Sequence, residues 1–337
     1  MYRLLGITLV LALLLTINAT TTLMAAGLAR ACKRLLWKCS ARTRAEILFV
    51  MRIGPPVIAI VAIAAFMIPS YYMYEPAVTD ERVSFKLAAL AAVSAIGIGL
   101  AFWRGLRSWL ATRSLLHQWL ATSTPIQLDA IAIPTFILQD YGFPLIAVVG
   151  AFRPRLFIAK HVLESLSEEE LAAAISHEYG HLDARDNFKR SVMRMSRAAL
   201  LIIPCGRWLD RAWSESSESA ADEHAAQKSS HVALDLASAL VRIARMIPSQ
   251  GQPQTLPAAV SGFLMVPDAP GVKVRVNRLV ELASTDPRLL SSSAPLFRFV
   301  PWFVLAVFLV VSVTIESRPQ VLAAVHQLVE HVVAFLC

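Results

Sequence analysis

One short segment of the sequence combines the residue types of a catalytic metal site. Residues 177–181 read His-Glu-Tyr-Gly-His, so two histidines stand four positions apart with a glutamate directly after the first. Side chains four positions apart lie on one face of a helix, about one turn from each other, and two such imidazoles can bind a single zinc ion. His177 and His181 are therefore candidate metal ligands. Glu178, which can reach a water at the ion, is the candidate base.

The residues before this segment predict the helix that the metal geometry requires. Ser167 is followed three positions later by Glu170, which is the pattern of a capping box, and acidic residues fill the first turn, where the helix dipole is positive. The pattern predicts a helix over residues 168–184. The simpler alternative for the two histidines is a surface helix with solvated imidazoles, and the predicted helix favours the metal site over it.

A catalytic zinc site needs a third protein ligand and one open position. An alanine-rich stretch over residues 215–226 is predicted to be helical, and it places Glu218 and Asp222 one turn apart on a shared face. One of these carboxylates can bind the ion while the other accepts a hydrogen bond from a ligating imidazole. Glu215 and His224 are rival third ligands. A solvated acidic helix is the alternative for the whole stretch.

The composition predicts a membrane protein rather than a single soluble domain. Of the 337 residues, 56% are hydrophobic and only 17% are charged, whereas about 25% is usual for soluble domains. Helices need roughly 20 apolar residues to cross a bilayer. Four uncharged runs approach or exceed this length: Leu4–Ala29, Ile53–Tyr74, Leu87–Trp103 and Phe299–Ile315. The first run is too long for the apolar core of a signal peptide, so we interpret it as a retained anchor. The last two runs are short, and a buried core helix is the alternative for each of them.

The basic residues beside these runs predict the orientation of the chain. Residues 30–52 carry seven Lys or Arg and one Glu, which places this loop in the cytoplasm by the positive-inside rule. The next loop contains Glu75, Asp80 and Glu81 and is predicted to lie outside. The N-terminus and the C-terminal tail then lie outside as well. Much of the net charge of +8 is therefore explained by basic residues that flank the predicted spans. The sequence also has no helix-turn-helix or zinc-finger pattern, so we expect no nucleic-acid partner.

The predicted fold class is a mainly α membrane protein with four transmembrane helices and a cytoplasmic α+β domain. The domain is expected to contain a small three-stranded sheet, since short β-branched and aromatic runs at 135–138, 145–149 and 156–159 are separated by turn residues. Four cysteines, Cys32, Cys39, Cys205 and Cys337, show no metal or disulfide pattern. The expected regions are three transmembrane helices in 1–113, the cytoplasmic domain in 114–298, a fourth transmembrane helix in 299–315 and an amphipathic tail in 316–337.

These segments together resemble a known family. His-Glu-Tyr-Gly-His-Leu-Asp-Ala-Arg-Asp at 177–186, followed by Glu218 in an ExxAD arrangement, is similar to the membrane gluzincins, and most similar to the BlaR/MecR-type antirepressor peptidases. The strand at 153–159 that leads into Leu-Ser-Glu-Glu-Glu-Leu, and a linker with Pro204 and residues 208–213, also resemble that group. So does the arrangement of three spans before the domain and one after it.

The resemblance implies roles for individual residues. His177, His181 and Glu218 would bind Zn²⁺, Glu178 would be the general base and Asp222 a supporting carboxylate. Asp186 matches the acidic position after the HExxH motif, where its role could be structural. Val274–Leu279 resembles the RxxRL run of related peptidases, which makes Arg275 a candidate for contacting the substrate or the transition state. The simpler alternative for Arg275 is a solvated charge on a helix.

The C-terminus departs from the family. Its β-lactam receptors carry a penicillin-binding sensor with a serine nucleophile in SxxK beyond the last span, whereas residues 316–337 contain no SxxK. Covalent β-lactam binding by that route is therefore not expected. Apolar residues at helical spacing make the tail amphipathic, as in an interfacial or packing helix, with a partner-binding stub as the alternative.

The expected function is that of a zinc metalloendopeptidase in the inner membrane of a bacterium, cleaving a cytoplasmic protein. The resemblance implies a regulatory substrate such as a transcriptional repressor, and a quality-control protease is an alternative. Substrate could bind as an added strand at an edge of the sheet. A non-catalytic scaffold with a structural zinc site is the alternative outside enzymes, but Glu178 favours the enzyme because a structural site needs no base.

Overall fold

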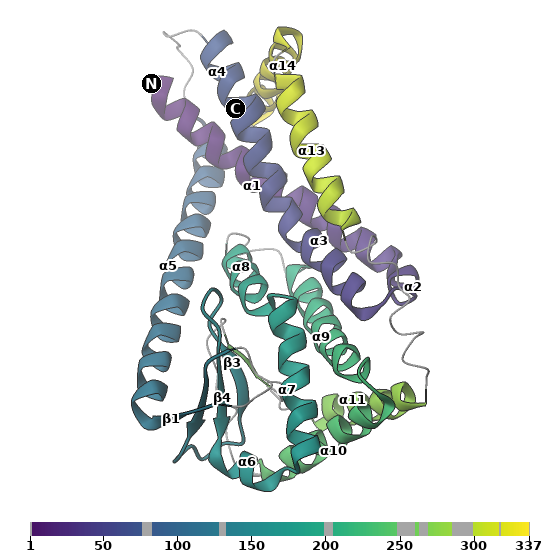
Figure 1. Cartoon of the computed structure of the whole chain (residues 1–337). Coiled ribbons are helices and arrows are strands. Elements are labelled where there is room, and N and C mark those ends of the chain that lie inside the picture. Colours follow the sequence, from purple (N-terminus) through teal and green to yellow (C-terminus); the bar gives the residue numbers. More distant parts are fainter. Residues whose placement is uncertain are drawn as a thin grey trace.

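The described residues form mainly helices and one small mixed sheet, and the sheet lies at the end opposite the two termini (Figure 1). Long helices fill the end where both termini lie, and the sheet with the shorter helices fills the other. The computed structural model describes residues 2–75, 83–127, 133–198, 205–247, 260–262, 269–284, 299–316 and 318–336. Asp80, Glu81, Pro204, Cys337 and the expected domain boundary at 298 lie outside these ranges.

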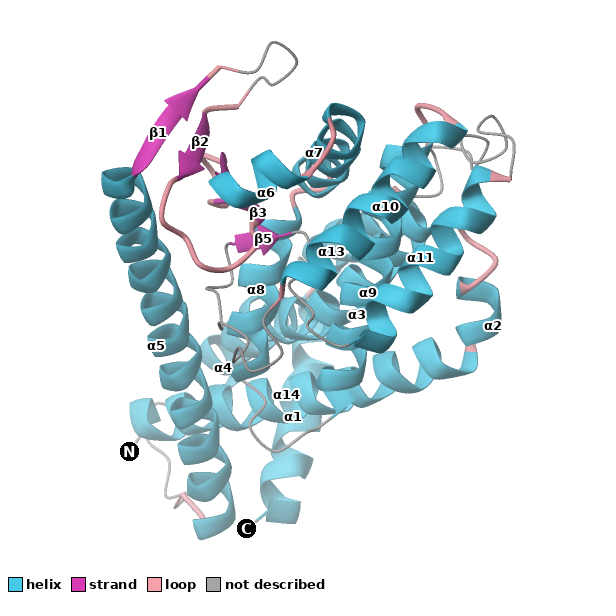
Figure 2. Ribbon diagram, turned by 90° about the horizontal axis from the view of Figure 1, so that it is seen from below, coloured by secondary structure: helices cyan, strands magenta, loops and turns pink. Residues whose placement is uncertain are grey.

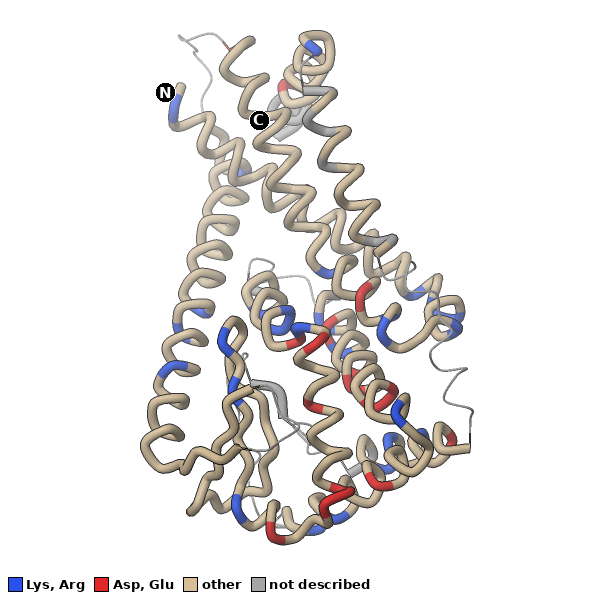
Figure 3. Tube along the Cα trace, viewed as in Figure 1, with Lys and Arg blue, Asp and Glu red and all other residues tan. Residues whose placement is uncertain are grey.

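Three of the described helices are long and apolar enough to cross a membrane, by length and composition. They correspond to the first three predicted spans, and each is longer than its uncharged run. Figure 3 shows few charged residues along these helices at the end of the termini, and many around the sheet. The three are α1 (Tyr2–Ala31), the continuous run of α3 (Ala41–Ala62), the π-helix η1 (Ile63–Met67) and α4 (Ile68–Tyr74), and α5 (Phe85–Thr122). The short helix α2 (Lys33–Leu36) joins the first two.

The predicted fourth span and the tail are both helical. Helix α13 (Val300–Glu316) covers the fourth uncharged run, and its crossing of the membrane stays a prediction. Helix α14 (Pro319–Leu336) packs on α4, where the Ser70 hydroxyl donates to the Leu322 carbonyl at 2.9 Å and the Tyr74 hydroxyl to the Pro319 carbonyl at 3.0 Å. The tail is therefore a packing helix in this structure.

In the part of the chain that the structure describes, the sheet has five strands in the order β1-β2-β4-β3-β5, so the prediction of three strands was incomplete. β1 continues directly from α5 and contains Pro125, which an edge strand tolerates. β5 pairs antiparallel with β3, so the far edge of β3 carries a strand of this chain. The strands are β1 (Ser123–Ile126), β2 (Thr135–Leu138), β3 (Ile146–Val149), β4 (Arg155–Ala159) and β5 (Val260–Gly262).

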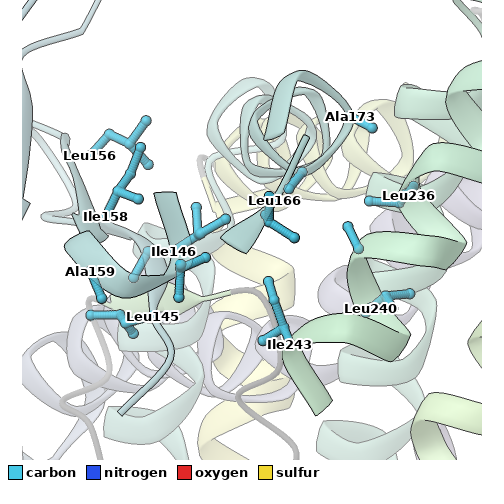
Figure 4. Close-up of a cluster of buried hydrophobic side chains, with 14 of the residues drawn as sticks. Leu145, Ile146, Leu156, Ile158, Ala159, Leu166, Ala173, Leu236, Leu240 and Ile243 are labelled. Atoms are coloured by element: carbon cyan, nitrogen blue, oxygen red, sulfur yellow. The ribbon is translucent and has the colours of Figure 1, made fainter. Parts of the chain in front are cut away.

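The core of this part lies between the sheet and the helices that cover it (Figure 2). Ile146 on β3 and Ile158 on β4 belong to one buried cluster with Leu236, Leu240 and Ile243 (Figure 4). The last three recur at helical spacing on α10 (Ser230–Met246), so a single apolar stripe of that helix faces the sheet. The other helices here are α6 (Lys160–Ser165), α7 (Glu168–Asp183), α8 (Asp186–Ala198), α9 (Cys205–Ala226) and α11 (Ala269–Ala283).

Helix α9 is tied to the membrane-type helix α3. The Arg52 guanidinium pairs with Asp210 at 2.9 Å, with both side chains buried, and Arg44 donates to the Ser216 hydroxyl at 2.9 Å. The linker predicted over residues 208–213 was wrong, because these residues form part of α9. The helix that carries Glu218 is therefore continuous and held against α3 over much of its length.

Candidate metal centre

The histidine pair lies on α7, as predicted. The Ser167 hydroxyl accepts the Glu170 backbone N–H at 3.2 Å, and the Glu170 carboxylate accepts the Ser167 N–H at 3.0 Å, so the capping box is complete. The helix then runs unbroken past the HExxH segment. His177 and His181 are fully buried and their rings meet edge to face, with centroids 4.9 Å apart.

Helix α9 crosses α7 at very close range beside this pair. A Cβ atom added to Gly180 would lie 2.9 Å from the Ala221 Cα atom, closer than real Cβ contacts. Glycine at position 180 therefore lets the two backbones approach. Ala221 stands between Glu218 and Asp222 on α9, so this contact brings both carboxylates to the imidazoles.

Glu218 joins His177 and His181 in a group of three residues that could hold one metal ion. Its carboxylate oxygens lie 3.7 Å from the His177 Nε2 atom and 3.6 Å from the His181 Nε2 atom, and one ligand atom from each residue lies within 4.8 Å of the others. In a tetrahedral zinc site with bonds near 2.1 Å, neighbouring ligand atoms lie about 3.4 Å apart. The observed spacing fits such an ion. Glu218 keeps 16% of its side chain exposed, so the group is open on one side.

Each imidazole is held on its other nitrogen by a carboxylate. Asp222 lies 2.9 Å from the His177 Nδ1 atom, and Asp186 lies 2.7 Å from the His181 Nδ1 atom. Ser217 donates its hydroxyl hydrogen to Asp186 at 2.6 Å. These contacts point both Nε2 atoms toward Glu218, which is the arrangement that orients metal-bound histidines.

Glu178 is buried beside the pair with no hydrogen bond to either carboxylate oxygen from the described residues. The His181 Nε2 atom also lacks a hydrogen-bond partner among them. Burial raises the pKa of Glu178, although the two histidines oppose this shift. A buried carboxyl with a raised pKa, next to a group of metal-ligating atoms, has the properties of a general base.

The structure overturns the simpler expectation that Arg275 is a solvated charge. Its guanidinium grips Asp222 through two hydrogen bonds of 2.7 and 3.0 Å and lies 3.2 Å from Glu218. Both carboxylates raise the pKa of Arg275 against the effect of burial. Arg275 therefore orients the acidic residues of the centre, and its contact with substrate stays a prediction.

The other candidate ligands, Glu215 and His224, do not belong to the group of ligand atoms formed by His177, His181 and Glu218. Glu215 is exposed and lines a cavity formed with α1 and α2, while His224 packs its Cβ atom near Gly180. A second His/Glu group at Glu75, His326 and Glu330 joins α4 to α14, and its Glu330 side chain is 49% exposed. Burial thus distinguishes the first group from the second.

Sequence reasoning missed two polar residues that support the centre. Ser217 was passed over because a serine inside an alanine-rich stretch carries no motif. Asn187 donates from its side-chain nitrogen to the carbonyls of Val148 at 2.9 Å and Gly150 at 3.3 Å, which fixes the end of β3 against α8. Its position directly after Asp186 was the only sequence signal for this role.

The electrostatic balance of the centre favours a cation. Burial alone would lower the pKa of His181, but Glu218 and Asp186 together raise it to about 10. Burial would raise the pKa of Asp222, yet Arg275 and His177 lower it to about 2, and the pKa of Glu218 lies well below its usual value because of the neighbouring positive groups. The carboxylates are therefore ionised at neutral pH and can neutralise a divalent ion.

Zinc binding to the metal-free protein at pH 7 is expected to release about one proton from His181. With a pKa of about 10 the imidazole is charged at pH 7, and it must be neutral to bind metal, so zinc affinity should rise with pH up to about 10. Calorimetric titrations in two buffers of different ionisation enthalpy measure the release. It should persist in Glu178→Gln, whereas zinc binding without proton release would contradict the assigned role of His181.

Replacing Asp186 with Asn should weaken zinc binding by about 10- to 100-fold, the usual effect of removing a carboxylate that orients a ligating histidine. Ser217→Ala should act in the same direction, because Ser217 holds Asp186 in place. Asp183→Asn is the matched control, since Asp183 lies three residues earlier and is 57% exposed. Competition with a fluorescent zinc chelator measures the affinities. An equal loss in D183N would show that only general charge matters.

Comparison with known proteins adds one finding. The model of Peptidase family M48 matches residues 147–209, a segment that runs from β3 through the HExxH helix into the start of α9. No curated protein matches the chain. The match supports a metallopeptidase, and with the three apolar helices it supports a membrane metallopeptidase in general. It stops before Glu218, Asp222 and Arg275, so the place of these residues rests on the geometry.

Proposed function

We propose that the protein is an integral-membrane zinc metalloendopeptidase that hydrolyses peptide bonds of a cytoplasmic protein. The observation that carries this proposal is the meeting of Glu218 with the Nε2 atoms of His177 and His181, beside the unbonded carboxylate of Glu178. Three protein ligands leave one position open, as in catalytic zinc sites, whereas structural sites use four.

The residues divide the work of hydrolysis. His177, His181 and Glu218 would hold Zn²⁺, which would supply Lewis-acid activation of the scissile carbonyl and of the attacking water. Glu178 takes one proton from that water as its oxygen bonds to the carbonyl carbon. Glu178 then passes this proton to the amide nitrogen, which leaves as an amine when the C–N bond breaks. Asp222, Asp186 and Arg275 keep the ligands in place.

The sequence and the sheet support the proposed substrate class and its side of the membrane. The basic residues in 30–52 support a position of the centre on the cytoplasmic side of the inner membrane, because cytoplasmic loops carry an excess of Lys and Arg. The resemblance to antirepressor peptidases favours a regulatory substrate such as a transcriptional repressor over damaged membrane proteins. Because β5 already pairs with β3, an extended substrate along β3 would have to replace β5, and strand addition at another edge is the alternative.

The proposal is tested by the protein fragments that the full chain produces. Cells that express the wild type should accumulate new cytoplasmic fragments that are absent with Glu178→Gln, and the purified chain in lipid should produce the same cuts. A zinc chelator should stop the cleavage and added zinc should restore it. A zinc-bound wild type that yields the same fragments as E178Q would support a scaffold with structural zinc instead.

A further inference from the structure

A second cavity lies on the side of α8 away from the metal ligands. It has a volume of about 880 Å³, within the range of small-molecule sites. Its walls are the part of α5 after Trp103, the loop between β3 and β4, and α8. None of the proposed zinc ligands or their carboxylate partners lines it. The proposed reaction therefore does not account for this cavity.

The charge of the cavity is of one sign. Arg104 and Arg113 on α5, Arg153 in the β3–β4 loop and Arg194 on α8 line it, and no Asp or Glu occurs among the described residues of its wall. Guanidinium groups bind phosphate through paired hydrogen bonds. Four arginines from three separate elements around one cavity therefore favour an anionic ligand.

The remaining wall is apolar and aromatic. Phe152 and Phe188 meet edge to face with ring centroids 5.7 Å apart, although Phe152 is 85% exposed. Trp109 lies under the Arg113 guanidinium at 5.6 Å, and Val192 and Met195 of α8 complete the surface. An anion alone would not use this apolar area, so the ligand that fits the cavity is an amphiphile with an anionic group.

The cavity begins where the membrane-type part of α5 ends. The uncharged run of α5 stops at Trp103, and Arg104 is both the first charged residue after it and the first lining residue. Figure 3 shows basic residues on α5 beside the part of the molecule where most of the other charged residues lie. Basic pockets between helices at this surface are suited to anionic lipid headgroups.

We propose that the cavity between α5 and α8 binds one anionic phospholipid of the membrane leaflet on the side of the metal centre. The arginines would hold its phosphate and the aromatic wall its glycerol backbone and upper acyl chains. Because the lining begins at Arg104, where the predicted span of α5 ends, a lipid of that leaflet would enter the cavity from the bilayer, whereas an acidic protein segment would have to enter from the membrane surface.

The experiment compares lipid retention by the full chain. Detergent-purified wild type is mixed with equal phosphatidylglycerol and phosphatidylcholine, and the bound lipid is counted by native mass spectrometry. We expect one phosphatidylglycerol per chain in preference to phosphatidylcholine, and a loss of retention of about 30-fold in Arg104→Gln/Arg113→Gln. The matched control Arg34→Gln/Lys38→Gln removes the same charge from exposed residues of the basic loop and should retain the lipid.

A second variant tests the cavity itself without a change of charge. In Val192→Trp the larger side chain would occupy part of the cavity, so this variant should also lose the lipid. The zinc content of the variant shows whether the chain has folded. Equal retention of both lipids, or equal losses in the control and the cavity variants, would overturn the proposal. Displacement of the lipid by inorganic phosphate at equal concentration would overturn it in favour of a free anion, and displacement by an acidic peptide in favour of a protein segment.

Discussion

Glu178→Gln is expected to abolish peptide cleavage while one zinc ion per chain is retained. General-base catalysis contributes about 10²- to 10⁴-fold to such reactions, and no other unbonded carboxylate lies beside the imidazole pair among the described residues. Glutamine has the same shape without the basic oxygen. Burial already raises the pKa of Glu178, so a neutral amide at this position should not disturb the fold. Cleavage rates and zinc content are measured on the same purified samples.

The matched control is Glu169→Gln on the same helix. Glu169 is exposed in the first turn of α7, eight residues before His177, and it is absent from the group formed by the two imidazoles and Glu218. Full cleavage by E169Q together with none by E178Q would locate the effect at the base. Full activity of E178Q, or zinc loss in that variant, would contradict the assigned role of Glu178.

The helical part of the centre could be predicted from the sequence because its determinants are local. The Ser167–Glu170 capping box fixes where α7 begins, and the four-residue spacing then fixes the relation of His177 to His181. The short strands around Ile146 and Ile158 were also predictable, since β-branched runs between turn residues carry their own signal. Nothing distant in the chain is needed for these assignments.

The residues alone did not decide the third ligand or the role of Arg275, because both depend on contacts between distant segments. The spacing left Glu218 and Asp222 as candidates with Glu215 and His224 as rivals, and only the family resemblance pointed to Glu218. In the structure, the close approach of Gly180 to Ala221 sets which face of α9 meets α7. Arg275 lies on α11 in a run where valines alternate with charged and polar residues, and this run does not show which of the polar residues is buried. Its burial follows from the two carboxylates on α9.

The sheet was underestimated for a similar reason. β5 contains only three residues and gains its identity by pairing with Ala147–Val149, far away in the chain. Such a segment has no periodicity of its own that could reveal a strand. β1 was hidden by Pro125 and by its direct continuation from α5.

Glu218→Ala is expected to remove zinc from the protein and to abolish cleavage with it. Loss of a residue that only orients a ligand costs about 10- to 100-fold in affinity, and the loss of a direct ligand should exceed this. Glu218 is also the principal group that raises the pKa of His181, so removing it takes away both a ligand atom and a negative charge. Zinc content after dialysis against a chelator that the wild type withstands measures the effect.

The rival ligands provide the controls for this variant. Glu215→Ala removes an exposed carboxylate from α9, about one turn before Glu218. His224→Ala removes an imidazole from the same helix, six residues after Glu218. Both variants should keep zinc and activity. Equal melting temperatures of zinc-free E218A and zinc-free wild type would show that the fold survives. Zinc loss with an intact fold means that Glu218 acts at the ion itself. Zinc retention by E218A, or its loss in either control, would place the third ligand elsewhere and remove the basis for a hydrolase with an open zinc position.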